Sequence, residues 1–142
     1  MVISGISWAV AQLIKVSLVL IKERRLDLRY MVSSGGMPSA HSATVCALAT
    51  SVALVEGFES VAFGITAILA IVVMYDAAGV RRAVSRQSVV LNRLVKEIMV
   101  KTPRYQVEHD LRELIGHTPF QVIIGAILGI GIAWAGVLMS GV

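Results

Sequence analysis

The stretch FQVIIGAILGIGIAWAGVLMSGV, residues 120–142, decides the fold class, because none of its 23 residues carries a charge. A helix of about 20 apolar residues crosses the ~30 Å hydrocarbon core of a bilayer, and residues 120–140 are sufficient. Three further stretches resemble it, at residues 2–21, 40–55 and 58–75, and together they hold only two charged side chains. None alternates apolar with polar residues as a half-buried strand does. We therefore predict an all-α, polytopic membrane bundle with four transmembrane helices.

The composition of the whole chain excludes other classes of protein. Of its 142 residues, 56% are hydrophobic and 15% are charged, and the mean hydropathy is +0.79. A soluble domain carries about a quarter charged residues, and a disordered chain needs low hydrophobicity. The single cysteine, Cys46, cannot form an internal disulfide, which excludes a disulfide-stabilised secreted fold. We predict one integral membrane domain over residues 1–142.

The basic residues gather on one predicted side of the membrane. With four spans, residues 22–39 and 76–119 form loops on that side, and they hold 12 of the 13 lysines and arginines. The positive-inside rule places these loops in the cytoplasm and both termini outside. We predict a multi-pass protein of the inner (plasma) membrane, with an uncleaved first span. Lys15, inside that span, is expected to snorkel to the interface or to make a polar contact in the bundle.

The second loop has a pattern of its own. Between residues 80 and 100 apolar side chains recur near helical spacing, with arginines and a lysine between them. This pattern predicts an amphipathic helix lying at the cytoplasmic interface, with its cations near anionic lipid head groups. The net charge of +4 therefore indicates membrane lipids as partners, and no nucleic-acid motif is present.

Three polar clusters lie where the predicted spans meet the cytoplasm, so they share one depth. They are GGMPSAHS at residues 35–42, DAAGVRR at 76–82 and GHTPFQ at 116–121. Each alone has a purely structural interpretation: a helix cap at Ser39, a boundary salt bridge at Asp76, a cap before the last span. Together they combine helix starts, histidines and arginines, which suit the binding of an anion. No set of carboxylates, cysteines and histidines has metal-ligand spacing, so we expect no metal and no cofactor.

The same clusters resemble a known family. Pro-Ser-Ala-His at residues 38–41 is similar to the Pro-Ser-Gly-His motif of the type-2 phosphatidic acid phosphatase and vanadium haloperoxidase superfamily. The strings GGMPSAHSA, DAAGVRRAVSRQ and LIGHTPFQV resemble its divergent branch, often labelled acid phosphatase/vanadium-dependent haloperoxidase-related. The likeness covers roughly residues 22–131.

The resemblance implies a phosphatase site. In the superfamily a histidine attacks phosphorus and forms a phosphohistidine, a role that falls by position on His117. A second histidine, matched by His41, protonates the leaving oxygen. Ser39 then binds phosphoryl oxygens, together with Lys22 and Arg29 of the first motif.

The chain departs from the superfamily pattern in its motifs, and the Ser-Arg pair of the third motif is absent. Tyr30 replaces the proline of the first motif. In the third motif, Ser-Arg-x5-His-x3-Asp, Leu111 stands at the Arg position and Gln121 at the Asp position. A histidine without a carboxylate partner is a poorer base. We expect Asp76 to substitute in space for the carboxylate, and the guanidinium to come from among Arg81, Arg82 and Arg112.

A competing alignment of the third motif starts at Ser85 and Arg86. It puts Asn92 at the nucleophile position, where an amide cannot attack phosphorus. We therefore prefer His117 as the nucleophile.

Three functions remain open from the sequence. The first is a membrane phosphatase acting on a phosphorylated lipid, either a phosphomonoester or a pyrophosphate, without a metal. The second is a non-catalytic carrier or binder of anionic lipid or phosphate, which the glutamine at position 121 favours. The third is a structural or assembly protein, because Gly125 and Gly129 form a Gly-x3-Gly pattern that permits close helix packing. That pattern fits a homo-oligomer, a dimer being our prediction, and equally fits packing within one chain.

Overall fold

The computed structural model describes residues 1–23, 36–80, 83–84, 87–91, 93–94 and 117–141. These residues form α-helices and one π-helical turn, and they include no strand. The elements are α1 (Val2–Glu23), α2 (Ala40–Glu56), α3 (Val61–Tyr75), the π-helical turn η2 (Asp76–Val80) and α5 (Pro119–Ser140). The predicted all-helical class is confirmed.

Three of these helical segments are long and apolar enough to cross a membrane. They are Val2–Ile21, Val61–Val80 and Pro119–Ser140, with mean hydropathies of 1.7, 2.1 and 2.4. The 17 residues of α2 are apolar too, but they form a shorter helix. Of the amphipathic helix predicted between residues 80 and 100, the structure describes helical pieces at 83–84, 87–91 and 93–94, and the rest lies outside the described residues.

Hydroxyl side chains define where three helices begin. Ser39, Ser60 and Thr118 are the N-caps of α2, α3 and α5, and each accepts a hydrogen bond from a backbone N–H in the first turn. The third apolar stretch was predicted to be helical from residue 58, but α3 starts at Val61. Residues 57–60 form a turn instead, because Gly57 has a φ of +89° and the Ser60 hydroxyl caps the N–H of Phe63.

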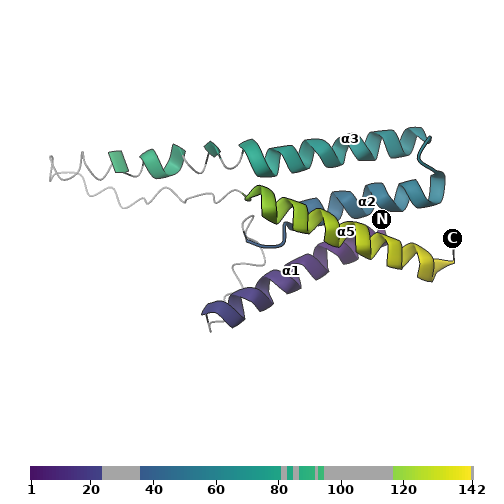
Figure 1. The fold of residues 1–142 in the computed structure, drawn as a ribbon, viewed down its shortest axis with the longest axis horizontal. Coiled ribbons are helices and arrows are strands. Elements are labelled where there is room, and N and C mark those ends of the chain that lie inside the picture. Colours follow the sequence, from purple (N-terminus) through teal and green to yellow (C-terminus); the bar gives the residue numbers. More distant parts are fainter. Residues whose placement is uncertain (24–35, 81–82, 85–86, 92, 95–116, 142) are drawn as a thin grey trace.

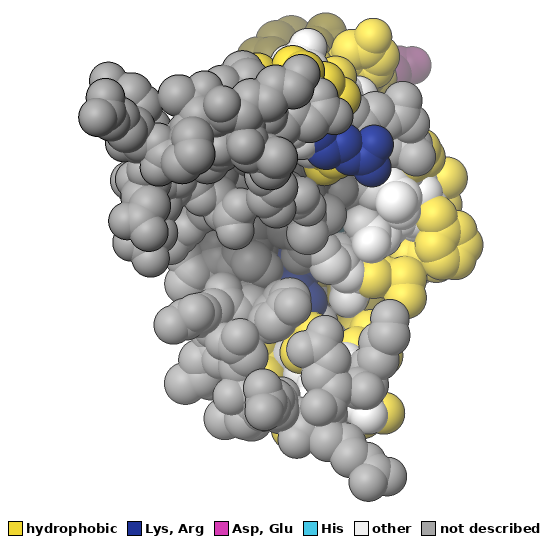
Figure 2. All heavy atoms as spheres, turned by 90° about the vertical axis from the view of Figure 1, so that its left-hand side faces the viewer, with side chains coloured by type: hydrophobic (Ala, Val, Ile, Leu, Met, Phe, Trp, Pro, Cys, Tyr) yellow, Lys and Arg dark blue, Asp and Glu magenta, His cyan; other side chains and the backbone are white. Residues whose placement is uncertain are grey.

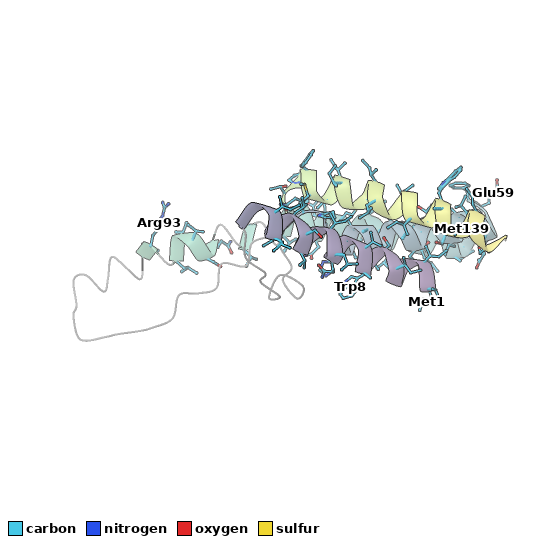
Figure 3. The ribbon with its side chains drawn as sticks, turned by 90° about the horizontal axis from the view of Figure 1, so that it is seen from below. Met1, Trp8, Glu59, Arg93 and Met139 are labelled. Carbon is cyan, nitrogen blue, oxygen red and sulfur yellow. The ribbon has the colours of Figure 1, made fainter. Side chains whose placement is uncertain are left out.

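The helix α2 occupies the centre of the bundle. It packs against α1, α3 and α5, and α1 also contacts α5 (Figure 1). The end of α1, the start of α2, the end of η2 and the start of α5 all lie toward the left of Figure 1. Arg93 lies beyond that end in Figure 3, whereas Glu59 and Met139 lie at the other. The three polar clusters predicted to converge therefore start from one end of the bundle.

Close contact between α2 and α5 depends on glycine. A Cβ on Gly125 would collide with the backbone carbonyl of Ser39, and one on Gly129 would collide with that of Ala43. The same Ala43 carbonyl accepts a hydrogen bond of 3.1 Å from the Ser7 hydroxyl of α1. The Gly-x3-Gly pattern thus serves packing within the chain, one of the two uses that the sequence left open.

Candidate functional site

The segment before α2 brings one polar cluster against the start of α5. Ser39 and Ser42 are fully buried, and the Ser39 hydroxyl oxygen accepts from the Ser42 N–H at 3.4 Å and the Ser42 hydroxyl at 3.0 Å. The Ser39 backbone N–H donates to the Gln121 carbonyl at 3.2 Å. The starts of α2 and α5 are thereby joined directly. Figure 2 looks onto this end of the molecule, where dark blue basic side chains appear beside yellow apolar ones.

His117, two residues before α5, is the most enclosed polar side chain of this region after the serines, with 1% of its surface exposed. Its Nδ1 lies 3.3 Å from Oε1 of Gln121. The same Oε1 accepts the Thr118 backbone N–H at 3.0 Å, in a capping box that opens α5. Within the described part of the chain, Nε2 of His117 is buried and has no hydrogen-bond partner.

These contacts determine which ring nitrogen carries the proton. A backbone N–H can only donate, so the bond from Thr118 fixes the oxygen of the Gln121 amide toward His117. An amide oxygen can only accept, so the neutral ring must hold its proton on Nδ1. The lone pair of His117 therefore lies on Nε2, the buried nitrogen that has no hydrogen-bond partner among the described residues. A histidine nucleophile needs such a lone pair.

Burial lowers the pKa of His117 from its ordinary value of 6.5. The positive charges of Lys15 and His41 lower it further, whereas Gln121 and the nearby Gly36 carbonyl act in the opposite direction. That carbonyl does not complete a hydrogen bond with Nε2. The ring is therefore neutral at physiological pH.

Lys15 lies beside this site, and its burial fits the second of the two expectations from the sequence, a polar contact in the bundle rather than snorkelling to the interface. It projects from α1, is 2% exposed, and its charge acts on His117. Its stem lies under Gly36, where an added Cβ would be 3.3 Å from Cγ and Cδ of the lysine. The sequence does carry a sign of this burial that we did not use: polar residues recur at helical spacing along α1. Ser4, Ser7 and Lys15 share one face of this apolar helix and are all buried.

The other predicted site residues are placed to differing degrees. His41 lies in the first turn of α2, exposed, and close enough for its charge to act on His117. Asp76 begins η2, which contacts α5, but the ring nitrogens of His117 make no hydrogen bond to it among the described residues. Lys22 is in the last turn of α1. Its role, and that of Asp76, stay predictions, as do those of four arginines outside the described residues: Arg29, Arg81, Arg82 and Arg112.

The fold and site define a small helical membrane protein with two histidines gathered at adjoining helix starts. Residues 1–132 match the model of the Divergent PAP2 family, and the chain belongs to that family. The resemblance drawn from the motifs is confirmed, and the match also includes α1 and its Lys15.

A curated relative agrees with a membrane location. The chain is 42% identical over 129 residues to a protein of Bacillus subtilis (strain 168) called "Uncharacterized membrane protein YuiD". The alignment covers 84% of this chain and 82% of the relative. No solved structure matches the chain.

Proposed function

We propose that this protein is a membrane phosphatase that hydrolyses a lipid phosphomonoester or pyrophosphate at the cytoplasmic face. One observation carries the proposal: His117 holds its proton on Nδ1 and presents a buried lone pair on Nε2. Membership of a divergent phosphatase family supports the same reaction class.

The reaction takes two steps. Nε2 of neutral His117 attacks phosphorus, a P–N bond forms, and the P–O bond to the leaving group breaks. Protonated His41 donates its proton to the departing oxygen, which belongs to an alcohol for a phosphomonoester and to a phosphate for a pyrophosphate, and it regains a proton from the water of the second step. Water then attacks the phosphohistidine, which releases inorganic phosphate and restores the histidine. Ser39 and the predicted cations Lys22, Arg29, Arg81, Arg82 and Arg112 would neutralise the equatorial oxygens, and Asp76 would stabilise the charged ring.

The proposal includes a topology. We place α2 across the membrane as a fourth span, because α1, α3 and α5 all pack against it. Its polar start is also hydrogen-bonded to the first turn of α5. The loops then face the cytoplasm of an inner (plasma) membrane, with both termini outside. A lipid in the inner leaflet would present its phosphate to the histidines.

Phosphate release from a panel of lipids by the purified protein tests the proposal. Phosphatidic acid, phosphatidylglycerophosphate and a polyprenyl phosphate are suitable members of the panel. We expect His117→Ala to abolish release and His41→Ala to slow it, whereas Glu59→Gln, which removes an exposed charge at the other end of the bundle, should leave it unchanged. Equal release by wild type and both histidine variants would overturn the mechanism.

A second function, non-catalytic binding or carriage of an anionic lipid, is favoured by one observation. The neutral amide of Gln121 holds the ring where the superfamily has a carboxylate, so the imidazolium gains no charge stabilisation from that contact. Stabilisation of the protein by phosphate, without turnover of any lipid in the panel, would select this function.

A further inference from the structure

The burial of Lys15 within an apolar helix calls for a reason. Lysine is among the residues least often buried, and a charge inside a membrane helix is costly and usually functional. Lys15 lies eight residues before the end of α1, about 12 Å along the helix axis, so it is far from that end. Its 2% exposure shows that the side chain turns into the bundle and not toward lipid.

Inside the bundle, the lysine side chain lies next to the segment that precedes α2 and close to His117. The stem contacts Gly36, and the charge of the ammonium acts on His117. Three separate parts of the chain therefore adjoin here: α1 with Lys15, the segment from Gly36 to His41, and His117 before α5. Nε2 of His117, which has no hydrogen-bond partner in the described part of the chain, belongs to the same cluster.

We propose that Lys15 is a binding residue of this site, whose ammonium holds the oxygens of a terminal phosphate group while Nε2 of His117 faces its phosphorus. An ammonium offers three donors and a compact positive charge, which suits a tetrahedral oxyanion. A role of Lys15 in lipid turnover rests on the proposed function. Binding of phosphate by Lys15 does not, because it requires no reaction.

Gly36 provides a structural reason for the position of the lysine. Its φ of +91° is unfavourable for residues with a Cβ, and a Cβ would press on the lysine stem at 3.3 Å. A glycine at this point lets the loop lie directly over Lys15. Gly36→Ala should therefore move the ammonium without removing its charge.

The test measures binding of inorganic phosphate to the full chain in detergent micelles by isothermal titration calorimetry. We expect Lys15→Met to weaken binding by about ten- to a hundredfold, because it removes a charge-assisted hydrogen bond. Lys15→Arg should retain part of the affinity, and Arg93→Met, an exposed charge removed from the far end of the described helix pieces, should retain all of it.

Wild-type affinity in Lys15→Met would overturn the inference. If Lys15→Met does not fold, Gly36→Ala decides in its place: weaker phosphate binding supports the inference, and unchanged binding overturns it. A parallel titration with nanodiscs, with and without phosphatidic acid, distinguishes a lipid phosphate from the free ion.

The inference and the proposed function can fail separately. Loss of phosphate binding in Lys15→Met, with no lipid turnover by wild type, keeps the lysine site and rejects the phosphatase. Turnover by Lys15→Met with the same kcat/KM as wild type keeps the phosphatase and rejects the lysine site.

Discussion

The oxygen of the Gln121 side chain serves two donors at once, and this has a chemical effect at the residue scale. It accepts the Thr118 N–H at 3.0 Å and Nδ1 of His117 at 3.3 Å. The first bond belongs to the helix cap, and the second selects the ring tautomer. Glutamine thus reproduces the orienting function of the expected aspartate but not its negative charge.

Replacing that amide by a carboxylate should change the acidity of the ring. Gln121→Glu keeps the length of the side chain and its capping oxygen, and adds a negative charge that favours the imidazolium. We expect the pKa of His117 to rise and the acid limb of the pH–rate profile to move to higher pH. Histidine NMR titration measures the pKa, with Gln121→Leu as the variant that loses both bonds. An unchanged pKa in Gln121→Glu would show that position 121 does not hold the ring.

The lowered pKa of His117 also predicts how stability depends on pH. The unfolded chain takes up a proton at this ring near pH 6.5, whereas the folded protein resists it to a lower pH. The contribution is therefore complete above pH 6.5 and is lost as the pH falls from there toward the folded pKa. The melting temperature of the detergent-solubilised protein should fall over this window, by less in His117→Gln. Parallel curves for the two proteins would contradict the prediction.

Motifs in the sequence pointed to three of the candidate site residues, whereas a fourth candidate, Lys15, could be recognised only from the structure. Ser39, His41 and His117 were identified because each lies in a short string that resembles a family motif. Lys15 has no such string, and an isolated lysine in an apolar helix usually snorkels. Only the position of α1 against Gly36 shows that it turns inward.

Between elements, the contact of α2 with α5 is the one that fixes the site. Gly125 adjoins the backbone of Ser39, the N-cap of α2, and Gly129 adjoins Ala43 one turn further on. Backbones can approach this closely only because neither glycine has a side chain.

Gly129→Ala should loosen this contact. The new Cβ would overlap the Ala43 carbonyl, and such overpacking typically costs about 1–3 kcal/mol. We expect a lower melting temperature in detergent and weaker phosphate binding. Gly131→Ala is the matched control, because its Cβ would have no neighbour within 4 Å and alanine favours the helix. Equal melting temperatures for the two variants would contradict the proposed role of Gly129.

The sequence predicted the helical segments well and their packing poorly. Runs of uncharged residues gave α1, α2 and α5 to within two residues, since hydrophobic length is a local property. The start of α3 was missed because Glu59 was tolerated in the span, whereas Gly57 and Ser60 impose a turn there. The central position of α2 depends on the sizes of the side chains that face one another on neighbouring helices. The periodicity of a single stretch contains no information about these pairs.

At the scale of the whole molecule, the two histidine motifs lie at one end of the bundle. Both described histidines lie at the end where α2 and α5 start, and Figure 1 places the C-terminus at the other. Composition alone predicted one membrane domain, and the order of spans and loops predicted that the two histidine motifs would share an end. Only the three-dimensional structure shows that Lys15 lies near these histidines.

Labelling with a membrane-impermeant maleimide tests the orientation. Ser140→Cys, at the exposed end of α5, should react in intact cells, and Ala83→Cys should react only after permeabilisation. The native Cys46 is buried, so the unmodified chain provides the background. The reverse pattern would place the histidine site outside the cell and contradict a cytoplasmic substrate.

The bond from the Ser39 N–H to the Gln121 carbonyl restricts how a ligand can enter. It joins the first turns of α2 and α5 beside the two imidazoles, so parting these helices would break this bond. A head group that reaches both histidines without breaking this bond must therefore approach around the two joined helix starts and not between them.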